Sequence, residues 1–412
     1  MLTSLQFMLL FSAVWHRIVD CGKVAMLFRA MPIYLVFLLM GVTGAMGPMS
    51  SQVSKEPAVA ALVPFFAFIA YALFSVPSGV LAARVGKKML LLLGLAFTGA
   101  ATAVPAFVEP SFALLLACIF VLGLGSTFLQ VAANPMMRDV SAEGAFSRNL
   151  ALAQGVKGVG SAVASYLVTA AAFIMPALSG MGWRGAFPIF FALTAVTFLV
   201  ASALKVDETA GGEKSAPPTI ANCIALLGVP SVALAVLGIF LYVGAEVCVA
   251  TFIQPALLGM GYEENSAALL GPSLFFAAIT VGRLVAGCMK PNARAFFRLS
   301  VALGLVGLIA LMAGLYFGQR VLTVSAVALC ALGFANIWPM LFAITVEERP
   351  EQSSELSGLM CMAICGGAVA PLVMGTLGGG TVPLAFAVPL VSFAYLTLLA
   401  AKRGASHTFG GT

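Results

Sequence analysis

The amino-acid sequence predicts an all-α polytopic membrane protein with twelve transmembrane helices in two halves of six. Of its 412 residues, 61% are hydrophobic and only 9% are charged, whereas soluble domains carry about 25% charged residues. The apolar segments are continuous over roughly twenty residues, the length that an α-helix needs to cross a hydrocarbon core about 30 Å thick. Strands of a membrane barrel would instead alternate polar and apolar residues. Lipid is therefore the expected solvent of this chain.

Six spans are expected before a polar central segment and six after it. The first six lie near residues 31–49, 57–82, 87–108, 111–135, 148–175 and 185–204. The second six lie near residues 226–257, 266–289, 296–317, 321–346, 356–378 and 381–401. Between them, the stretch from Lys205 to Thr219 is the longest polar one and contains Gly-Gly and Pro-Pro pairs, which are typical of flexible linkers.

The domain organisation that follows is a pair of similar halves. We expect an N-terminal half over residues 31–204, a linker over 205–220 and a C-terminal half over 221–402. Cytoplasmic segments are expected at residues 1–30 and 403–412, with Met26 and Met31 open as alternative start residues. Six spans plus six with a polar middle are typical of transporters built from repeats.

The distribution of Lys and Arg predicts that both termini are cytoplasmic. With the N-terminus inside, only Lys55, Arg184 and Arg320 fall in external loops, and nearly all other basic residues lie in cytoplasmic segments. This bias fixes orientation in most membrane proteins. A bacterial inner membrane is the expected location, and a monomer the expected state. The net charge of +6 therefore reflects loops that anchor the helices, and no nucleic-acid partner is expected.

Enzymatic and metal-dependent functions are not expected. The eight cysteines lie almost entirely in apolar runs without a CxxC pair, and the chain has only two histidines. This pattern indicates small buried side chains rather than a disulfide framework or a metal site. The spans contain no Ser–His pair or cluster of His, Asp and Glu suited to catalysis, so no cofactor is expected.

Three charged side chains remain within the expected spans, and such residues indicate function because they are costly in lipid. Glu246 is the only acid among them. A carboxyl there can bind and release a proton, so Glu246 is the candidate for proton coupling, with a structural hydrogen bond as the alternative. Lys157 lies about 15 Å from the cytoplasmic end of its helix and either meets a solute, pairs with Glu246 or is solvated. Arg283 lies near a helix end, where a structural or gating role is expected.

Neutral polar side chains also lie within the spans. Gln130 and Asn134 are four residues apart and therefore share one face of the fourth span. Their amides can bind hydroxyl groups without a charge. Asn336 and Trp338 flank Pro339 in the tenth span, where an indole could stack on a sugar ring, with ordinary packing as the alternative.

The segment after the second span resembles the loop signature of the major facilitator superfamily. It reads GVLAARVGKK, from Gly79 to Lys88, with Ala83 at the position where the signature has Asp. The resemblance implies the major facilitator fold. The positions expected to act in gating or structure are Gly79, Arg84, Gly86, Lys87 and Lys88.

Longer stretches are similar to the fucose–galactose/glucose–proton symporter branch of that superfamily. They are LQVAANP (129–135), SRNLALAQ (147–154), LYVGAEV (241–247), GFANIWPMLFAI (333–344) and SGLMCMAICGGAVAPLVMG (357–375). The resemblance implies proton-driven import of a small sugar with alternating access around a central site. It implies sugar contacts by Gln130, Asn134, Gln154 and Asn336, and a coupling role for Glu246.

The chain departs from this branch at charged positions. Fucose permeases carry an acid in the first helix and another at the position of Gln130, and this chain has neither. Lys157 stands where the branch usually has Asn. These departures keep open an alternative in which the solute is an anionic sugar or another small organic anion bound by Lys157. A sugar sensor that does not transport is a further alternative. The expected partners are a small sugar, protons and the lipid bilayer.

Overall fold

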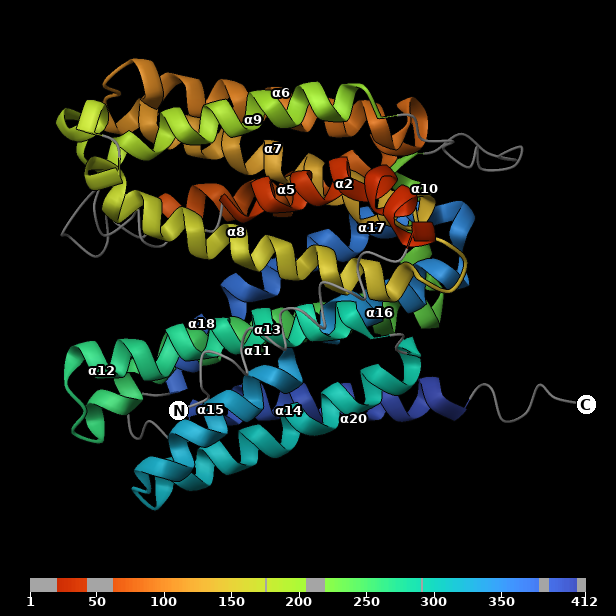
Figure 1. Cartoon of the computed structure of the whole chain (residues 1–412). Helices are drawn as coiled ribbons and strands as arrows, with labels where there is room; N and C mark the ends of the chain where they lie inside the picture. The colour runs from red at the N-terminus through yellow and green to blue at the C-terminus, as the bar shows by residue number, and fades with distance from the viewer. Residues whose placement is uncertain are drawn as a thin grey trace, which may run out of the picture.

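The computed structural model describes residues 21–42, 62–174, 176–204, 219–289, 292–377 and 385–405. Within these ranges the chain is a bundle of long helices and contains no strand. Figure 1 shows the N-terminal half, coloured red to yellow-green, as one layer and the C-terminal half, coloured green to blue, as a second layer beside it. The predicted fold class is therefore confirmed.

In the described residues the N-terminal half contains six long helices. They are α2 (Cys21–Val42), α5 (Leu62–Val85), α6 (Lys87–Phe107), α7 (Phe112–Asp139), α8 (Phe146–Ile174) and α9 (Ala186–Ser202), with the short helix η2 (Pro176–Gly185) before α9. The first helix begins at Cys21, ahead of the predicted start near residue 31, and the end of that predicted span lies outside the described residues. The long helices α6, α7 and α8 each run through their span as one element.

The C-terminal half repeats this order with more interruptions. Its elements are α10 (Ile220–Ala225), η3 (Leu226–Gly228), α11 (Pro230–Gly259), α12 (Glu264–Ala268), η4 (Leu269–Ser273), α13 (Leu274–Cys288), α14 (Ala293–Tyr316), α15 (Arg320–Phe334), α16 (Ile337–Glu348), η5 (Pro350–Gln352), α17 (Ser353–Met362), η6 (Ala363–Cys365), α18 (Gly366–Leu377) and α20 (Ala387–Ala405). Nine helical stretches in the described part of the chain are long and apolar enough to cross a membrane. Most of the predicted linker and both terminal tails lie outside the described residues, so the domain boundaries stay a prediction.

Two spans of the C-terminal half are interrupted in the described residues, the eighth in its first half and the tenth near its middle. The eighth span contains a π-helical turn at η4, with Pro272 in it and a non-helical Gly271. The tenth span breaks at Ala335 and Asn336, between α15 and α16. Pro339 lies in the first turn of α16, where a proline removes no helical hydrogen bond. Broken helices are tolerated in a membrane where protein or a cavity satisfies the freed backbone groups.

The helix α16 is enclosed by protein on every side. All residues from Ile337 to Val346 are buried. The helix contacts α8 of the N-terminal half as well as α11 and α14 of its own half. It therefore lies at the centre of the bundle, between the two layers.

The two halves meet at the end of the bundle that carries the linker. The most extensive contacts between them pair α5 with α17 and α8 with α13. A Cβ atom added to Gly79 would lie 3.1 Å from the Cα of Gly358, and one added to Gly155 would lie 2.7 Å from a methyl carbon of Leu284. Glycine at these positions lets the helix backbones approach closely, as small residues do in membrane helix pairs.

Candidate functional site

A group of polar side chains lies between the two halves, at the middle of the helices. We call it the central polar cluster, and both halves contribute to it. Its members are Gln130, Asn134, Gln154, Lys157, Glu246, Arg283, Asn336 and Cys361.

The N-terminal half contributes two side-chain pairs from α7 and α8. The Lys157 Nζ atom donates a hydrogen bond to Oε1 of Gln130 at 3.1 Å. The Gln154 Nε2 atom donates to Oδ1 of Asn134 at 3.3 Å. The three amides are buried, whereas Lys157 is partly accessible. The shared face predicted for Gln130 and Asn134 is thus observed, and α8 faces it.

A thiol connects this face to the C-terminal half. The Nδ2 atom of Asn134 lies 3.9 Å from the sulfur of Cys361, which is buried at the end of α17. The sequence predicts only that Cys361 is a small buried side chain, because its apolar surroundings and its spacing are like those of the other cysteines. Its place beside Asn134 follows from the packing of α17 against α5 and α7.

The C-terminal half contributes an ion pair between α11 and α13. A guanidinium nitrogen of Arg283 lies 3.9 Å from Oε2 of Glu246, and the two side chains are 13% and 18% exposed. The Arg283 Nε atom also donates to the carbonyl oxygen of Ala335 at 2.9 Å. Among the described residues, the ion-pair partner of Glu246 is therefore Arg283 and not Lys157. The sequence predicts a gating role for Arg283, but its guanidinium lies against the candidate coupling acid.

The break in the tenth span supplies two polar groups. The carbonyl of Ala335 accepts the hydrogen bond from Arg283. The Nδ2 atom of Asn336 donates to the carbonyl of Gly282 at 3.1 Å, while its Oδ1 atom is buried and has no hydrogen-bond partner among the described residues. An unsatisfied buried acceptor is costly. This oxygen is therefore a suitable acceptor for a hydroxyl group of a bound solute.

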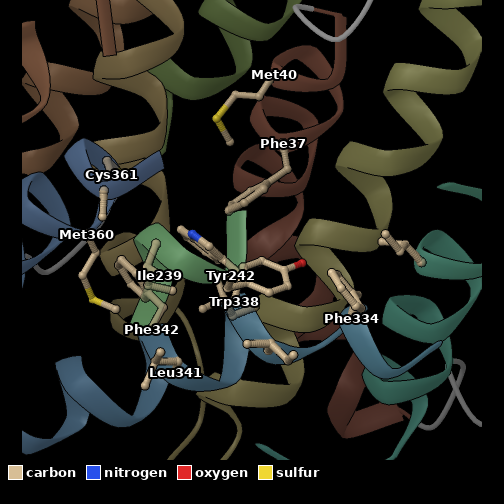
Figure 2. Close-up of a cluster of buried hydrophobic side chains, with 14 of the residues drawn as sticks. Phe37, Met40, Ile239, Tyr242, Phe334, Trp338, Leu341, Phe342, Met360 and Cys361 are labelled. Atoms are coloured by element: carbon tan, nitrogen blue, oxygen red, sulfur yellow. The ribbon is translucent and has the colours of Figure 1, made fainter. Parts of the chain in front are cut away.

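Trp338 belongs to an apolar cluster beside these polar groups. Its indole stacks on the ring of Phe342, with centroids 5.0 Å apart and planes 15° apart. Figure 2 shows the two rings among side chains from both halves. The labelled members of this apolar cluster are Phe37, Met40, Ile239, Tyr242, Phe334, Trp338, Leu341, Phe342, Met360 and Cys361. One face of the indole is thus occupied by packing, so a role in stacking on a sugar stays a prediction.

Tyr242 is a site residue that the sequence did not predict, and it lies one helical turn before Glu246 on α11. Its side chain is fully buried and lies beside the Glu246–Arg283 pair. The spacing of Tyr242 and Glu246 could have predicted this, because residues four apart share a helix face. A buried aromatic hydroxyl also normally has a hydrogen-bond partner.

The charges of the central polar cluster do not cancel. The charges of both Arg283 and Glu246 act on Lys157, so the three lie within electrostatic range of one another. Two cations and one carboxylate leave a net charge of one positive. Such a charge has large effects in the protein interior, where the effective dielectric constant is far below that of water.

The loop signature lies away from this cluster, at the linker end. Gly86 has a φ of 91°, a conformation that favours glycine. The Nζ atom of Lys87 lies 2.6 Å from a carboxylate oxygen of Asp139, and the two side chains are 9% and 1% exposed. Lys88 donates to the carbonyl of Ser202 at 2.8 Å, and Arg84 is exposed. These contacts join the start of α6 to the ends of α7 and α9.

Asp139 supplies the acid of this region. It is the last residue of α7 and pairs with Lys87. Ala83 occupies the position of the usual acid in the signature. The charge of Lys87 in the loop is therefore balanced by an acid from α7. Gly79 of the same signature forms the close contact with Gly358.

Metal ligation finds no support in the described part of the chain. No three His, Cys, Asp or Glu side chains there lie close enough to hold a metal ion. The arrangement of amides, one ion pair and one further cation is suited to binding a polar solute.

Comparison with known proteins gives consistent results. A "Glucose/galactose transporter" of Brucella abortus biovar 1 (strain 9-941) is 29% identical over 357 residues, which cover 81% of this chain and 83% of that protein. The solved structure of the E. coli fucose:proton symporter FucP (N162A) has a TM-score of 0.78 at 18% identity, covering 92% of this chain and 98% of that one. The proton:xylose symporter XylE has a TM-score of 0.72 at 12% identity, covering 91% of this chain and 94% of that one. The sequence profile of the Major Facilitator Superfamily matches residues 24–371, and the chain therefore belongs to this superfamily of membrane transporters.

Proposed function

We propose that this protein is a secondary active transporter that imports a hexose-sized sugar by proton symport. The observation that carries the proposal is the central polar cluster, which lies between the halves and includes the unpaired oxygen of Asn336. The Brucella relative, described as a glucose/galactose transporter, supports a sugar as the solute. We further propose a monomer in a bacterial inner membrane with both termini cytoplasmic.

Sugar binding is assigned to the amides of both halves. Gln130, Asn134 and Gln154 present donors and acceptors from α7 and α8, and Asn336 presents an acceptor from the other layer. Hydroxyl groups of a sugar both donate and accept hydrogen bonds, so they match amide groups on two sides. Trp338 and Tyr242 provide apolar surface within the cluster that Figure 2 shows.

Proton coupling is assigned to Glu246. As a carboxylate, Glu246 holds the guanidinium of Arg283, which also contacts the broken tenth span. Protonation removes the negative charge and weakens this ion pair, so the contact between α11 and α13 loosens. A proton on Glu246 would thereby change the packing of three spans around the solute.

Alternating access is assigned to the contacts at the linker end. In this structure α5 packs on α17 and α8 packs on α13 at that end. If the linker is cytoplasmic, this conformation is closed to the cytoplasm, and release of the solute requires these helix pairs to separate. The gating roles of Gly79, Gly86, Lys87 and Lys88 follow from their place at this contact or next to it.

Uptake into proteoliposomes tests the proposal. With an imposed pH gradient, we expect at least one sugar of a panel to accumulate, and Glu246→Gln to abolish accumulation while sugar exchange at equal pH continues. The control is Glu263→Gln, an exposed carboxyl at the start of α12, which should accumulate sugar normally. Undiminished accumulation in Glu246→Gln would remove Glu246 as the proton carrier, and no accumulation with either gradient polarity would remove symport altogether.

A further inference from the structure

We propose that the solute of the central polar cluster is an acidic sugar, a hydroxylated monocarboxylate of hexose size whose carboxylate binds Lys157. This inference rests on the proposed function, because it takes the central polar cluster as the solute site. It replaces a neutral hexose with an anionic one on the basis of charges and contacts in the structure.

The first step concerns how the charges are paired. Glu246 lies 3.9 Å from Arg283 and balances that cation. Lys157 donates to the neutral amide oxygen of Gln130, which offers a hydrogen bond and no charge. Among the described residues no carboxylate lies within ion-pair distance of Lys157. One cation of the cluster is therefore left for a ligand to balance, and membrane cations are usually paired.

Close packing fixes the position of α8, the helix that carries Lys157. Two glycines of α8, Gly155 and Gly158, pack against Leu284 and Thr280 of α13 on either side of Arg283. On another side, Gly41 of α2 packs against the backbone carbonyl of Lys157 itself. The helix is thus held between two neighbours, and the side chain reaches toward Gln130 in the bundle centre.

The third step concerns access. The amides around Lys157 are buried, and Gln154 donates to Asn134, whereas Lys157 is partly accessible. An ammonium has three donors, and Gln130 accepts from it once. Lys157 thus has donors available for the oxygens of a carboxylate.

The fourth step concerns the rest of the ligand. The Oδ1 atom of Asn336 has no hydrogen-bond partner among the described residues, so a group of the solute that reaches it needs a donor. A hydroxyl group provides one, and a simple carboxylate such as acetate does not. A ligand with a carboxylate for Lys157 and hydroxyls for the amides satisfies both halves. Hexuronates and aldonates are the simplest compounds of this kind.

Uptake of paired sugars tests the proposal. Proteoliposomes with an imposed pH gradient are given D-galacturonate and D-glucuronate or the neutral D-galactose and D-glucose. We expect at least tenfold higher apparent affinity for the acids. Lys157→Asn should lower the ratio of acid uptake to neutral uptake at least tenfold, and Lys157→Arg should retain the preference for acids. Lys402→Asn, an exposed cation at the end of α20, is the matched control and should behave as the wild type.

A second variant covers the case in which Lys157→Asn does not fold. Gln130→Glu retains a hydrogen-bond partner for Lys157 and balances the charge of Lys157 within the protein. This variant should therefore also lower acid uptake at least tenfold. If the wild type prefers the neutral sugars and neither variant changes that preference, this inference is wrong. The proposed function is then unaffected. Failure of every sugar to accumulate would overturn the proposed function, and this inference with it.

Discussion

The two halves of the bundle have the same order of spans, but they contribute different chemistry to the centre. The N-terminal half has uninterrupted helices there, and α7 and α8 present neutral amides with one cation. The C-terminal half has broken spans and presents an ion pair whose arginine also donates to the backbone carbonyl of Ala335. Recognition of hydroxyl groups needs a rigid set of donors and acceptors, whereas a response to protons needs a charge whose partners can change. The difference suggests that the first half mainly binds and the second half mainly responds.

The break in the tenth span makes the second role possible. In a regular helix the carbonyl of Ala335 would accept from the N–H of residue 339, but that residue is a proline and has no N–H, so the carbonyl is available to Arg283. Arg283 is thus held by Glu246 and by Ala335 at the same time. The ion pair is therefore tied to the position of α15 and α16.

The largest expected effect comes from breaking the ion pair on one side only. Arg283→Met leaves the Glu246 carboxylate buried without its cation, and loss of one partner of a buried pair costs about 3–5 kcal/mol. We expect a large drop in the thermal unfolding midpoint in detergent. The double variant with Glu246→Gln should recover most of it. Lys157→Met, the counterpart in the N-terminal half, strands no carboxylate and should cost less. Equal losses in both halves would contradict the division of roles.

A smaller effect is expected where the halves touch. Gly358→Leu places a side chain against the carbonyl of Ser75, which a Cβ atom alone would approach to 2.8 Å. Overpacking of this kind costs about 1–3 kcal/mol, and here it penalises only the conformation closed at the linker end. We expect uptake to slow by roughly tenfold or more, since 1.4 kcal/mol is a factor of about ten.

The control for this variant is Gly259→Leu at the end of α11. Nothing lies within 4 Å of a Cβ atom at Gly259, so its uptake should remain normal. Accessibility of cysteines introduced at the linker end reports the conformation directly. A Gly358→Leu protein with wild-type uptake and accessibility would show that this contact does not gate transport.

The smallest effect is expected among the neutral amides. Gln154→Ala removes the hydrogen bond to Asn134, and a neutral hydrogen bond contributes about 1 kcal/mol. We expect the apparent affinity for the sugar to fall by roughly fivefold while the response to the pH gradient is kept. Gln319→Ala, an exposed amide at the start of α15, serves as the control. A loss of proton coupling in Gln154→Ala would show that the N-terminal half also responds to protons.

The fold could be predicted from the sequence because hydrophobic length and basic loops are dictated by the bilayer. The site could be predicted in part. Gln130, Asn134, Gln154 and Lys157 come together because their spacing on two helices decides which face they share. The partner of Glu246 could not be predicted, because the choice between Lys157 and Arg283 depends on which helices cross at the centre. Cys361 and Asp139 were missed for the same reason, since each gains its role from a neighbour distant in sequence.

The enclosure of α16 has a consequence for how this transporter can change over time. Most spans must keep a hydrophobic surface on the side that faces lipid, whatever solute the protein binds. From Ile337 to Val346 every residue of the helix is buried in protein. Its amino-acid composition is therefore constrained by its protein neighbours and by the solute, and not by lipid. New substrate preferences could therefore arise along this helix without any loss of insertion into the membrane. The same enclosure makes it intolerant of changes in volume, so such preferences would arise through paired substitutions on α16 and the helices around it.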